Sequence, residues 1–156
     1  MSTREIYNAI QVSDRLTTAG QPTEAQLRDA AAEGFTAVIN LVGHYTSNPL
    51  PGEAELIGEL GLTYVLIPVD WGAPTDADFD AFDEAMNRLA GGKLLVHCAA
   101  NYRVTAFYSL YAQKRLGWTA EQAEAFREPI WAGSDYPVWE SFIARKQAET
   151  RSAGPA

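Results

Sequence analysis

The chain has 156 residues, enough for one domain with a real hydrophobic core. Its formal net charge of −8 argues against a nucleic-acid or acidic-membrane partner, because both require a basic surface. No segment is apolar and long enough to span a bilayer, and a single cysteine excludes an internal disulfide, so we expect a cytoplasmic protein. We expect one domain over residues 1–156, ordered from about residue 6 to residue 149, with a frayed tail at 150–156.

The first half of the chain alternates strand patterns with helix patterns. Short apolar or β-branched runs predict strands at 10–12, 16–18, 35–42 and 62–67. Thr23 begins a capping-box pattern that opens a helix ending at Gly34, and a second helix over 53–60 is closed by Gly61. Residues 43–52 and 68–74 are predicted loops at strand ends.

The second half continues the alternation. Thr75 caps a helix whose inward positions are Phe79, Phe82, Met86 and Leu89. A buried strand is expected at 94–96, and three further helices at 106–116, 119–127 and from Ser134 or Asp135 onward. The last helix is expected to pack inward through Val138, Trp139, Phe142 and Ile143. The whole pattern predicts an α/β fold, with a mainly parallel sheet covered by helices on both faces.

One stretch combines three chemical features within a few residues. The apolar strand ends at His97 and Cys98, and Arg103 follows the cysteine after four intervening residues, where the next helix begins. A helix N-terminus presents unpaired N–H groups and a positive dipole, which bind anions and favour a thiolate. A guanidinium adds bidentate recognition of phosphate-like groups. A nucleophile and an anion site are therefore predicted in one turn of backbone.

This His-Cys-x4-Arg stretch resembles the phosphate loop of the protein tyrosine phosphatases in their small dual-specificity-like form. The resemblance extends over roughly residues 10 to 142 and includes bacterial phosphatase-like sequences with the same shortened loop. It implies that Cys98 attacks phosphorus, that Arg103 binds the phosphoryl oxygens, and that His97 orients the loop. It also implies that the loop residues bind the phosphate, and these are Ala99, Ala100, Asn101, Tyr102, Arg103 and Val104.

The loop departs from the family pattern in its length. The family places five residues between the cysteine and the arginine, whereas here there are four. Counted from Cys98, Val104 occupies the usual arginine position and Thr105 the position of the family's hydroxyl residue. One element is therefore displaced, and this lowers the expected activity.

An upstream aspartate is expected to protonate the leaving group, as the family's acid does. Asp70 is the first candidate because it lies on a loop at a strand end, where its alternative role is to cap a turn. Asp76 and Asp78 have the positions of helix-start charges, although either one is a substitute acid if the loop folds inward.

Several other residues carry two interpretations each. Asn101 suits a positive φ or a substrate contact, and Tyr102 either walls the site or covers the helix start. Thr105 either bonds the thiolate or bonds the helix backbone, and His44 is a weak candidate for a second proton carrier. The four tryptophans are expected to pack, and no cofactor or metal site is expected because the two histidines and one cysteine lack ligand spacing.

Three functions follow from this site. The first is a cysteine-dependent phosphatase acting on a phosphorylated protein or small molecule. The second is a rhodanese-like sulfurtransferase, which the Cys-x4-Arg loop length favours. The third is a non-catalytic phosphate-binding protein with a degenerate loop.

Overall fold

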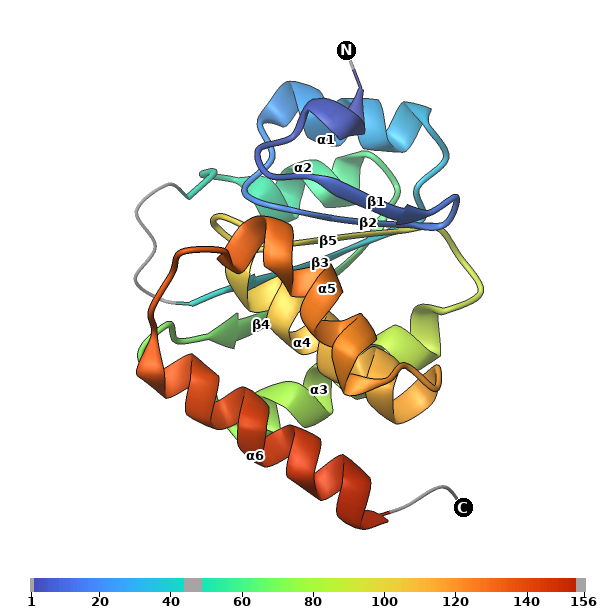
Figure 1. The fold of residues 1–156 in the computed structure, drawn as a ribbon. Coiled ribbons are helices and arrows are strands. Elements are labelled where there is room, and N and C mark those ends of the chain that lie inside the picture. The colour runs from blue at the N-terminus through green and yellow to red at the C-terminus, as the bar shows by residue number, and fades with distance from the viewer. Residues whose placement is uncertain (1, 44–48, 154–156) are drawn as a thin grey trace.

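A computed structural model shows a five-stranded sheet with helices on both faces (Figure 1). It describes residues 2–43 and 49–153, with side chains to residue 150. The strands are β1 (Ile10–Ser13), β2 (Leu16–Ala19), β3 (Ala37–Val42), β4 (Thr63–Val69) and β5 (Leu94–His97). The helices are a 3-10 turn η1 (Thr3–Glu5) followed by α1 (Glu24–Ala32), α2 (Glu53–Glu59), α3 (Asp76–Leu89), α4 (Tyr102–Arg115), α5 (Ala120–Trp131) and α6 (Pro137–Ala153).

The strand order is β1-β2-β5-β3-β4, which puts β5 at the centre of the sheet. Strands β2, β5, β3 and β4 run parallel, and only β1 pairs antiparallel with its neighbour β2. His97 at the end of β5 lies between Ala19 of β2 and Asn40 of β3. The predicted mainly parallel sheet is confirmed, and the loops that follow the parallel strands meet at one edge.

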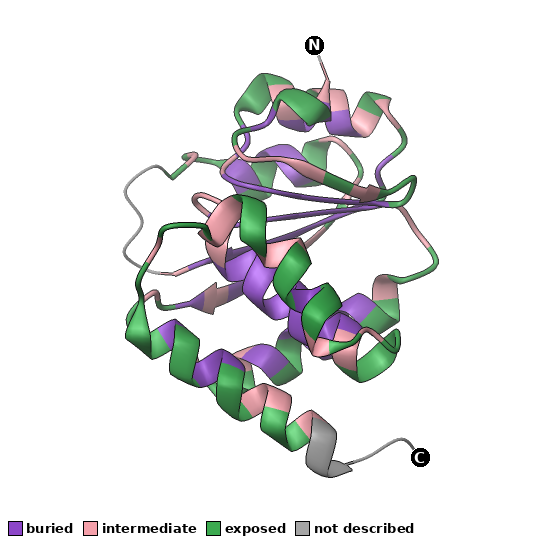
Figure 2. Ribbon diagram, viewed as in Figure 1, coloured by how far each residue is buried: buried purple, intermediate pink, exposed green. Residues whose placement is uncertain are grey.

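Helices cover the two faces of the sheet unequally. Helices α1 and α2 lie on one face and α3 to α6 on the other (Figure 1). Buried residues are concentrated in the strands and in α4 (Figure 2). The central strand supplies both cores, because Leu95 packs with α1 and α2 whereas Leu94 and Val96 pack with the larger helical layer. The expectation that both faces of the sheet are covered is confirmed.

The helix starts follow the sequence closely. Thr23, Thr75 and Thr119 each accept a hydrogen bond from the backbone N–H three residues on, at 3.1 Å in each case. The residue at that third position in turn accepts a bond from the cap backbone, which completes a capping box in α1, α3 and α5.

Several boundaries differ from the prediction, and helix α4 begins at Tyr102, four residues before its expected start. Strand β4 continues through Pro68 to Val69, which it can do because β4 is an edge strand and the missing N–H breaks no ladder bond. Helix α5 runs past Arg127 to Trp131 despite Pro129, and the N–H of Ala132 closes it on the Glu128 carbonyl at 2.9 Å. Helix α6 reaches Ala153, beyond the start of the expected tail.

The inward face of α6 also needs one correction. Trp139, Phe142 and Ile143 are buried as predicted, but Val138 is 50% exposed. A helix turns about 100° per residue, so a residue adjacent to this stripe lies on its solvent flank. Within the described residues, none of the helices combines the length and the apolar character needed to cross a membrane.

Candidate active site

The predicted loop joins the end of β5 to the start of α4. Residues 98–101 connect the two elements, and Asn101 stands immediately before the helix with φ of 69°. Its side chain is fully buried, and Nδ2 donates to the Asn8 carbonyl at 2.8 Å. The expected positive φ at Asn101 is confirmed, and a side-chain hydrogen bond from the buried amide holds this turn in place.

Neighbouring segments hold the loop from outside. The Ala99 carbonyl accepts from the Gln21 N–H at 3.0 Å, and the Ala100 carbonyl accepts from Asn8 Nδ2 at 3.0 Å. A Cβ at position 20 would lie 2.8 Å from the Ala99 carbonyl oxygen, so Gly20 is required for this close approach. The loop is therefore held in one shape by the chain segments at 7–8 and 20–21.

Cys98 lies at the floor of the loop. Its thiol is free, its residue exposure is 1%, and its N–H donates to the Ala19 carbonyl at 3.2 Å. The first intrahelical backbone bond of α4 is from Thr105 to Asn101, so the N–H groups of residues 102–104 precede it. The thiol thus sits below a helix start with the donor groups that an anion needs.

His97 anchors the floor to a buried carboxylate. Its Nε2 lies 2.7 Å from Glu53 Oε2, and its Nδ1 lies 3.2 Å from the Cys98 carbonyl oxygen. The two ring nitrogens thus lie against two oxygen atoms, one from the Glu53 carboxylate and one from the loop backbone. Burial raises the pKa of the Glu53 carboxyl, but the hydrogen bond and charge of His97, together with hydrogen bonds from Gln21 and Tyr64, outweigh burial and lower this pKa overall. The predicted orienting contact of His97 with the loop is present.

Sequence reasoning missed the polar network around Glu53. Gln21 Nε2 donates to the second carboxylate oxygen at 2.8 Å, and Asn40 Nδ2 bonds the Tyr64 hydroxyl at 3.0 Å. Burial raises the pKa of Tyr64 to about 12. The nearby Glu53 charge adds to this increase, and the hydrogen bond from Asn40 opposes it. The sequence did contain one indication of this network, because Asn40 is a polar residue inside the apolar run of β3. Glu53 offered none, because an acidic residue in a first helical turn is ordinary.

Arg103 is buried and joins α4 to the end of β4. Its Nη1 donates to the Val69 carbonyl at 2.9 Å, and the guanidinium carbon lies 6.0 Å from the Trp71 ring centroid. The residue is 5% exposed, and its Nε is buried without a partner in the structure. A buried unpaired donor is costly, so this Nε is the donor that an oxyanion at the loop would satisfy.

The structure separates the three candidate acids. Asp70 is exposed, and it directly follows the Val69 carbonyl that Arg103 contacts. Asp76 pairs with Arg145 at 2.9 Å, and Asp78 belongs to the capping box of α3. Asp76 and Asp78 are therefore helix-start charges, as their positions indicate, and Asp70 remains the candidate acid beside the loop.

The residues after the arginine pack inward. The Thr105 hydroxyl donates to the Asn101 carbonyl at 2.8 Å and accepts from Trp131 Nε1 at 3.0 Å. Thr105 was expected to bond either the thiolate or the helix backbone, and the structure shows the backbone bond, which is common for threonine in a helix. Val104 is fully buried in the apolar core, so the position that a longer loop would give to arginine is a packing site.

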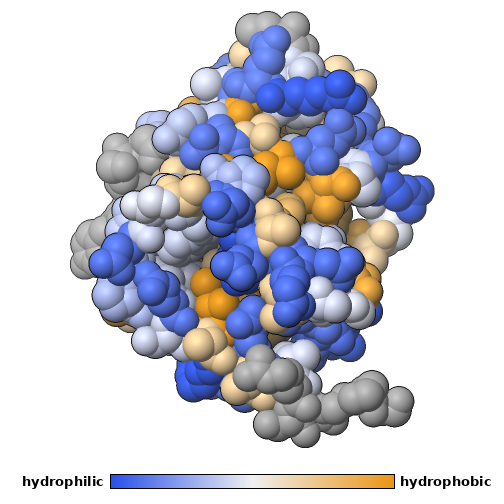
Figure 3. Space-filling view, viewed as in Figure 1, coloured by the Kyte–Doolittle hydropathy of each residue, from blue (hydrophilic) through white to orange (hydrophobic). Residues whose placement is uncertain are grey.

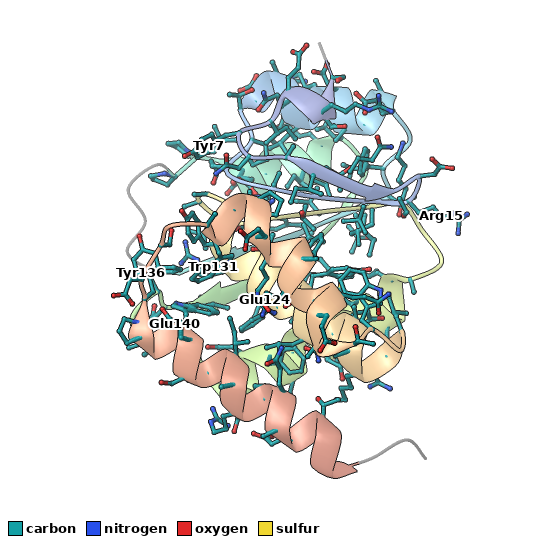
Figure 4. All side chains as sticks on the ribbon, viewed as in Figure 1. Tyr7, Arg15, Glu124, Trp131, Tyr136 and Glu140 are labelled. Atoms are coloured by element: carbon teal, nitrogen blue, oxygen red, sulfur yellow. The ribbon has the colours of Figure 1, made fainter. Side chains whose placement is uncertain are left out.

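An aromatic cluster covers the helix start and the Asp70 loop. The Trp71 ring stacks on Trp131 at 6.0 Å and lies edge-on to Tyr102 at 5.9 Å and to Tyr136 at 4.8 Å. Trp139 Nε1 donates to the Trp71 carbonyl at 2.7 Å. Trp131 and Tyr136 lie beside the start of α4 in Figure 4. The expected packing role of these tryptophans is confirmed, and Tyr102 contributes to the cover over the helix start.

Two expectations remain to be placed. His44 lies outside the described residues. Among the residues that are described, no group of three histidine, cysteine, aspartate or glutamate side chains could hold a metal ion.

Comparisons with known proteins agree with this fold. No protein-family model matches the chain. The crystal structure of Tk-PTP superposes with a TM-score of 0.76 at 19% identity, over 90% of this chain and 97% of that one. PTPMT1 in complex with PI(5)P superposes with a TM-score of 0.75 at 17% identity, over 95% and 99% of the two chains. The chain therefore has the same fold as Tk-PTP and PTPMT1.

A relative with higher sequence identity shows the family to which the chain belongs. A DUF442 protein of Shewanella putrefaciens CN-32, described as a candidate phosphatase, is 34% identical over 92% of this chain and 91% of its own, with a TM-score of 0.84. The chain belongs to the DUF442 family. It is also 34% identical over 105 residues to a "Beta-lactamase hydrolase-like protein" of Agrobacterium fabrum. The match covers 65% of this chain and 24% of that protein, so it spans about a quarter of the length of this curated relative.

Proposed function

We propose that this chain is a cysteine-dependent phosphatase that hydrolyses phosphate monoesters through a Cys98-phosphate intermediate. The observation that carries the proposal is the buried Nε of Arg103, which has no partner in the structure and belongs to the first turn of the helix that follows Cys98. A nucleophile, a guanidinium donor and helix N–H groups thus belong to one strand-loop-helix unit, and together they suit a phosphoryl group.

The reaction has two steps. The Cys98 thiolate attacks phosphorus, the P–O ester bond breaks, and Asp70 gives its proton to the departing oxygen. Water then attacks the phosphocysteine, the S–P bond breaks, and the Asp70 carboxylate takes the proton from water. Phosphate leaves and the thiolate is restored. Because His97 bonds the Cys98 carbonyl and Glu53 at once, the nucleophile keeps its position through both steps.

The short loop argues for modest activity. It supplies one backbone N–H fewer than a five-residue loop, and Arg103 Nη1 is already engaged by the Val69 carbonyl. Loss of one positioned oxyanion donor costs about 10²–10³ in rate. Ground-state binding of the anion should suffer less, because the helix start and the Arg103 Nε remain.

A second function at the same residues is sulfur transfer, and the four-residue spacing between Cys98 and Arg103 favours it. The thiolate would attack the outer sulfur of thiosulfate, the S–S bond would break, and sulfite would leave. The resulting Cys98 persulfide would pass its outer sulfur to cyanide as thiocyanate and regenerate the thiolate. Thiosulfate is also an oxyanion, so the same donors would hold it.

Because Cys98 is the single cysteine, one experiment separates these functions. The purified chain and its Cys98→Ser variant are incubated with p-nitrophenyl phosphate and, separately, with thiosulfate and cyanide. We expect phosphate release by the wild type alone, with a phosphocysteine adduct in the intact mass after acid quench, and an unchanged melting temperature for Cys98→Ser. Thiocyanate formation with a persulfide adduct would select the sulfurtransferase. Oxyanion binding without turnover of either substrate would select the non-catalytic phosphate-binding protein.

A further inference from the structure

A groove lies between α5 and α6, and Cys98 is not among the residues that line it. Both helices pack on α4, and the hollow between them has a volume of about 380 Å³. That volume lies within the range of protein ligand sites. In Figure 4, Glu124 and Glu140 are labelled on its two sides, with Trp131 at its upper end. We call this hollow the α5–α6 groove, because residues of both helices line it.

The two walls of the groove have the same helical spacing. The α5 wall is formed by Glu124, Arg127, Glu128 and Trp131. The α6 wall is formed by Glu140, Ile143, Ala144 and Gln147. In each helix these residues stand at i, i+3, i+4 and i+7, the spacing with which a helix packs against another helix. Two such faces are thus turned to a space that a third helix would fill.

The floor of the groove is apolar and its rim is acidic. Trp131 and Ala144 provide accessible apolar surface, and the largely buried Ile143 also lines the groove. An apolar patch ringed by hydrophilic side chains is visible between the two helices in Figure 3. The rim carries three carboxylates, Glu124, Glu128 and Glu140, and all three residues are exposed. Within the described residues, none of these three glutamates takes part in a salt bridge.

Arg127 does not cancel this charge at the rim. It is partly buried, and its Nη1 donates inward to the Ser109 hydroxyl of α4 at 2.8 Å. Burial lowers its pKa, although the nearby Glu124 opposes the shift. The Arg127 guanidinium is therefore turned toward α4, and the three glutamates leave the rim negative.

We propose that the α5–α6 groove docks a basic amphipathic helix of a partner protein. Its apolar stripe would cover Trp131, Ile143 and Ala144, and its lysine or arginine side chains would reach the three rim glutamates. Charge complementarity favours this occupant over a second copy of the chain, because each copy carries a net charge of −8.

The groove also adjoins the proposed active site. Trp131 lines it and donates from Nε1 to the Tyr102 carbonyl at 3.2 Å, while Ser134 lines it and bonds the Tyr102 hydroxyl at 3.1 Å. A docked helix would therefore contact two residues that hold the start of α4.

The test measures binding of a labelled synthetic helix by fluorescence anisotropy. The probe has about 18 residues, leucine at heptad positions a and d, and lysine and alanine elsewhere, long enough to be helical when bound. We expect saturable binding to the full chain that weakens with added salt. Glu124→Gln/Glu128→Gln should weaken it roughly fivefold, because two surface ion pairs are lost. Ala144→Trp should abolish it by filling the groove.

A matched control is available on the opposite face of the sheet. Glu55 and Glu59 are exposed on α2 with the same i, i+4 spacing, so Glu55→Gln/Glu59→Gln removes equal charge elsewhere. Equal weakening by both double variants would overturn the proposal in favour of general charge attraction, as would equally tight binding of a probe with glutamate in place of lysine. Binding that survives Ala144→Trp would also overturn it. Sedimentation showing a dimer that Ala144→Trp dissociates would instead assign the groove to a second copy.

Discussion

At the scale of single residues, the site depends on how buried polar atoms are paired. The His97 ring bonds a carboxylate on one side and the Cys98 carbonyl on the other, so side chain and loop are fixed together. Arg103 has one donor on the Val69 carbonyl and a buried Nε with no partner. Charged groups are held here without solvent, where hydrogen bonds are strong and unpaired donors costly.

The role of Asp70 is tested by the leaving group. If Asp70 protonates the departing oxygen, Asp70→Asn should lower kcat on an alkyl phosphate by roughly 10²-fold or more. The loss should be about tenfold or less on a phosphate ester of an acidic phenol, which leaves without a proton. Steady-state kinetics on both esters check this, with Asp76→Asn as the control because Asp76 is paired with Arg145. Equal losses on both esters would mean that Asp70 is structural.

Glu53 should be the most sensitive residue for stability near the site. Glu53→Ala leaves the buried His97 and Gln21 without their carboxylate, and breaking a buried pair in this way costs about 3–5 kcal/mol. Chemical denaturation of the variant, compared with the exposed Glu55→Ala on the same helix, measures the difference. Indistinguishable free energies of unfolding for the two variants would show that the pair contributes nothing net.

At the scale of elements, the unit formed by β5, the loop at 98–101 and α4 determines the direction in which the Arg103 side chain points. The four-residue loop can join β5 to α4 because Asn101 adopts a left-handed backbone conformation, and its side-chain amide donates a hydrogen bond to the Asn8 carbonyl. Val104 is buried in the core, so α4 has a fixed rotation about its axis. The short loop therefore makes Arg103 reach the end of β4, where it meets the residue before Asp70.

Insertion of a glycine between Asn101 and Tyr102 tests whether loop length limits the reaction. The insertion restores the family spacing, adds one backbone donor and frees Arg103 to turn toward the anion. If geometry is limiting, kcat/KM on an aryl phosphate should rise by up to 10²–10³-fold, the value of one oxyanion donor. An active wild type that the insertion slows would show instead that the short loop is adapted to its own chemistry.

At the scale of the whole molecule, acidic groups outnumber basic ones, and the two acidic residues that are buried among the described residues, Glu53 and Asp83, are both paired. Asp83 is 5% exposed and accepts from Arg115 Nε at 3.0 Å and from Lys114 Nζ at 2.8 Å. Burial raises the pKa of Asp83, but the bonds from Arg115 and Lys114 outweigh it and lower the pKa overall. Asp83 thus ties α3 to the end of α4, on the side of the sheet with the larger helical layer.

These lowered carboxyl pKa values predict loss of stability in acid. A carboxylate with a lowered folded-state pKa stabilises the fold above its ordinary pKa, and the contribution is lost as pH falls through the lowered value. The ordinary values are 4.5 for Glu53 and 3.8 for Asp83. The melting temperature should therefore be nearly constant from about pH 7 to pH 5 and fall steeply below about pH 4.5.

Asp83→Asn provides the comparison for this profile. It should be less stable than the wild type by roughly 1–3 kcal/mol at neutral pH, since a charge-assisted pairing is lost. The difference between the two melting temperatures should narrow as pH falls below 3.8, because the wild type there loses the contribution of the ionised Asp83. Two curves that stay parallel down to pH 3 would show that Asp83 does not titrate with folding.

The sequence by itself determined the order and type of the elements, the mainly parallel sheet and the strand-loop-helix unit around Cys98. Those features are local: the capping threonines, the glycines after helices and the apolar run before His97 act within a few residues of themselves. Other features follow from pairings between distant segments. These are the Glu53 carboxylate under His97, 44 residues away, the Val69 carbonyl on Arg103, and the edge position of β4 that admits Pro68. Only the tertiary structure decided them, because an acidic helix start or a backbone carbonyl looks the same in sequence until its partner is known.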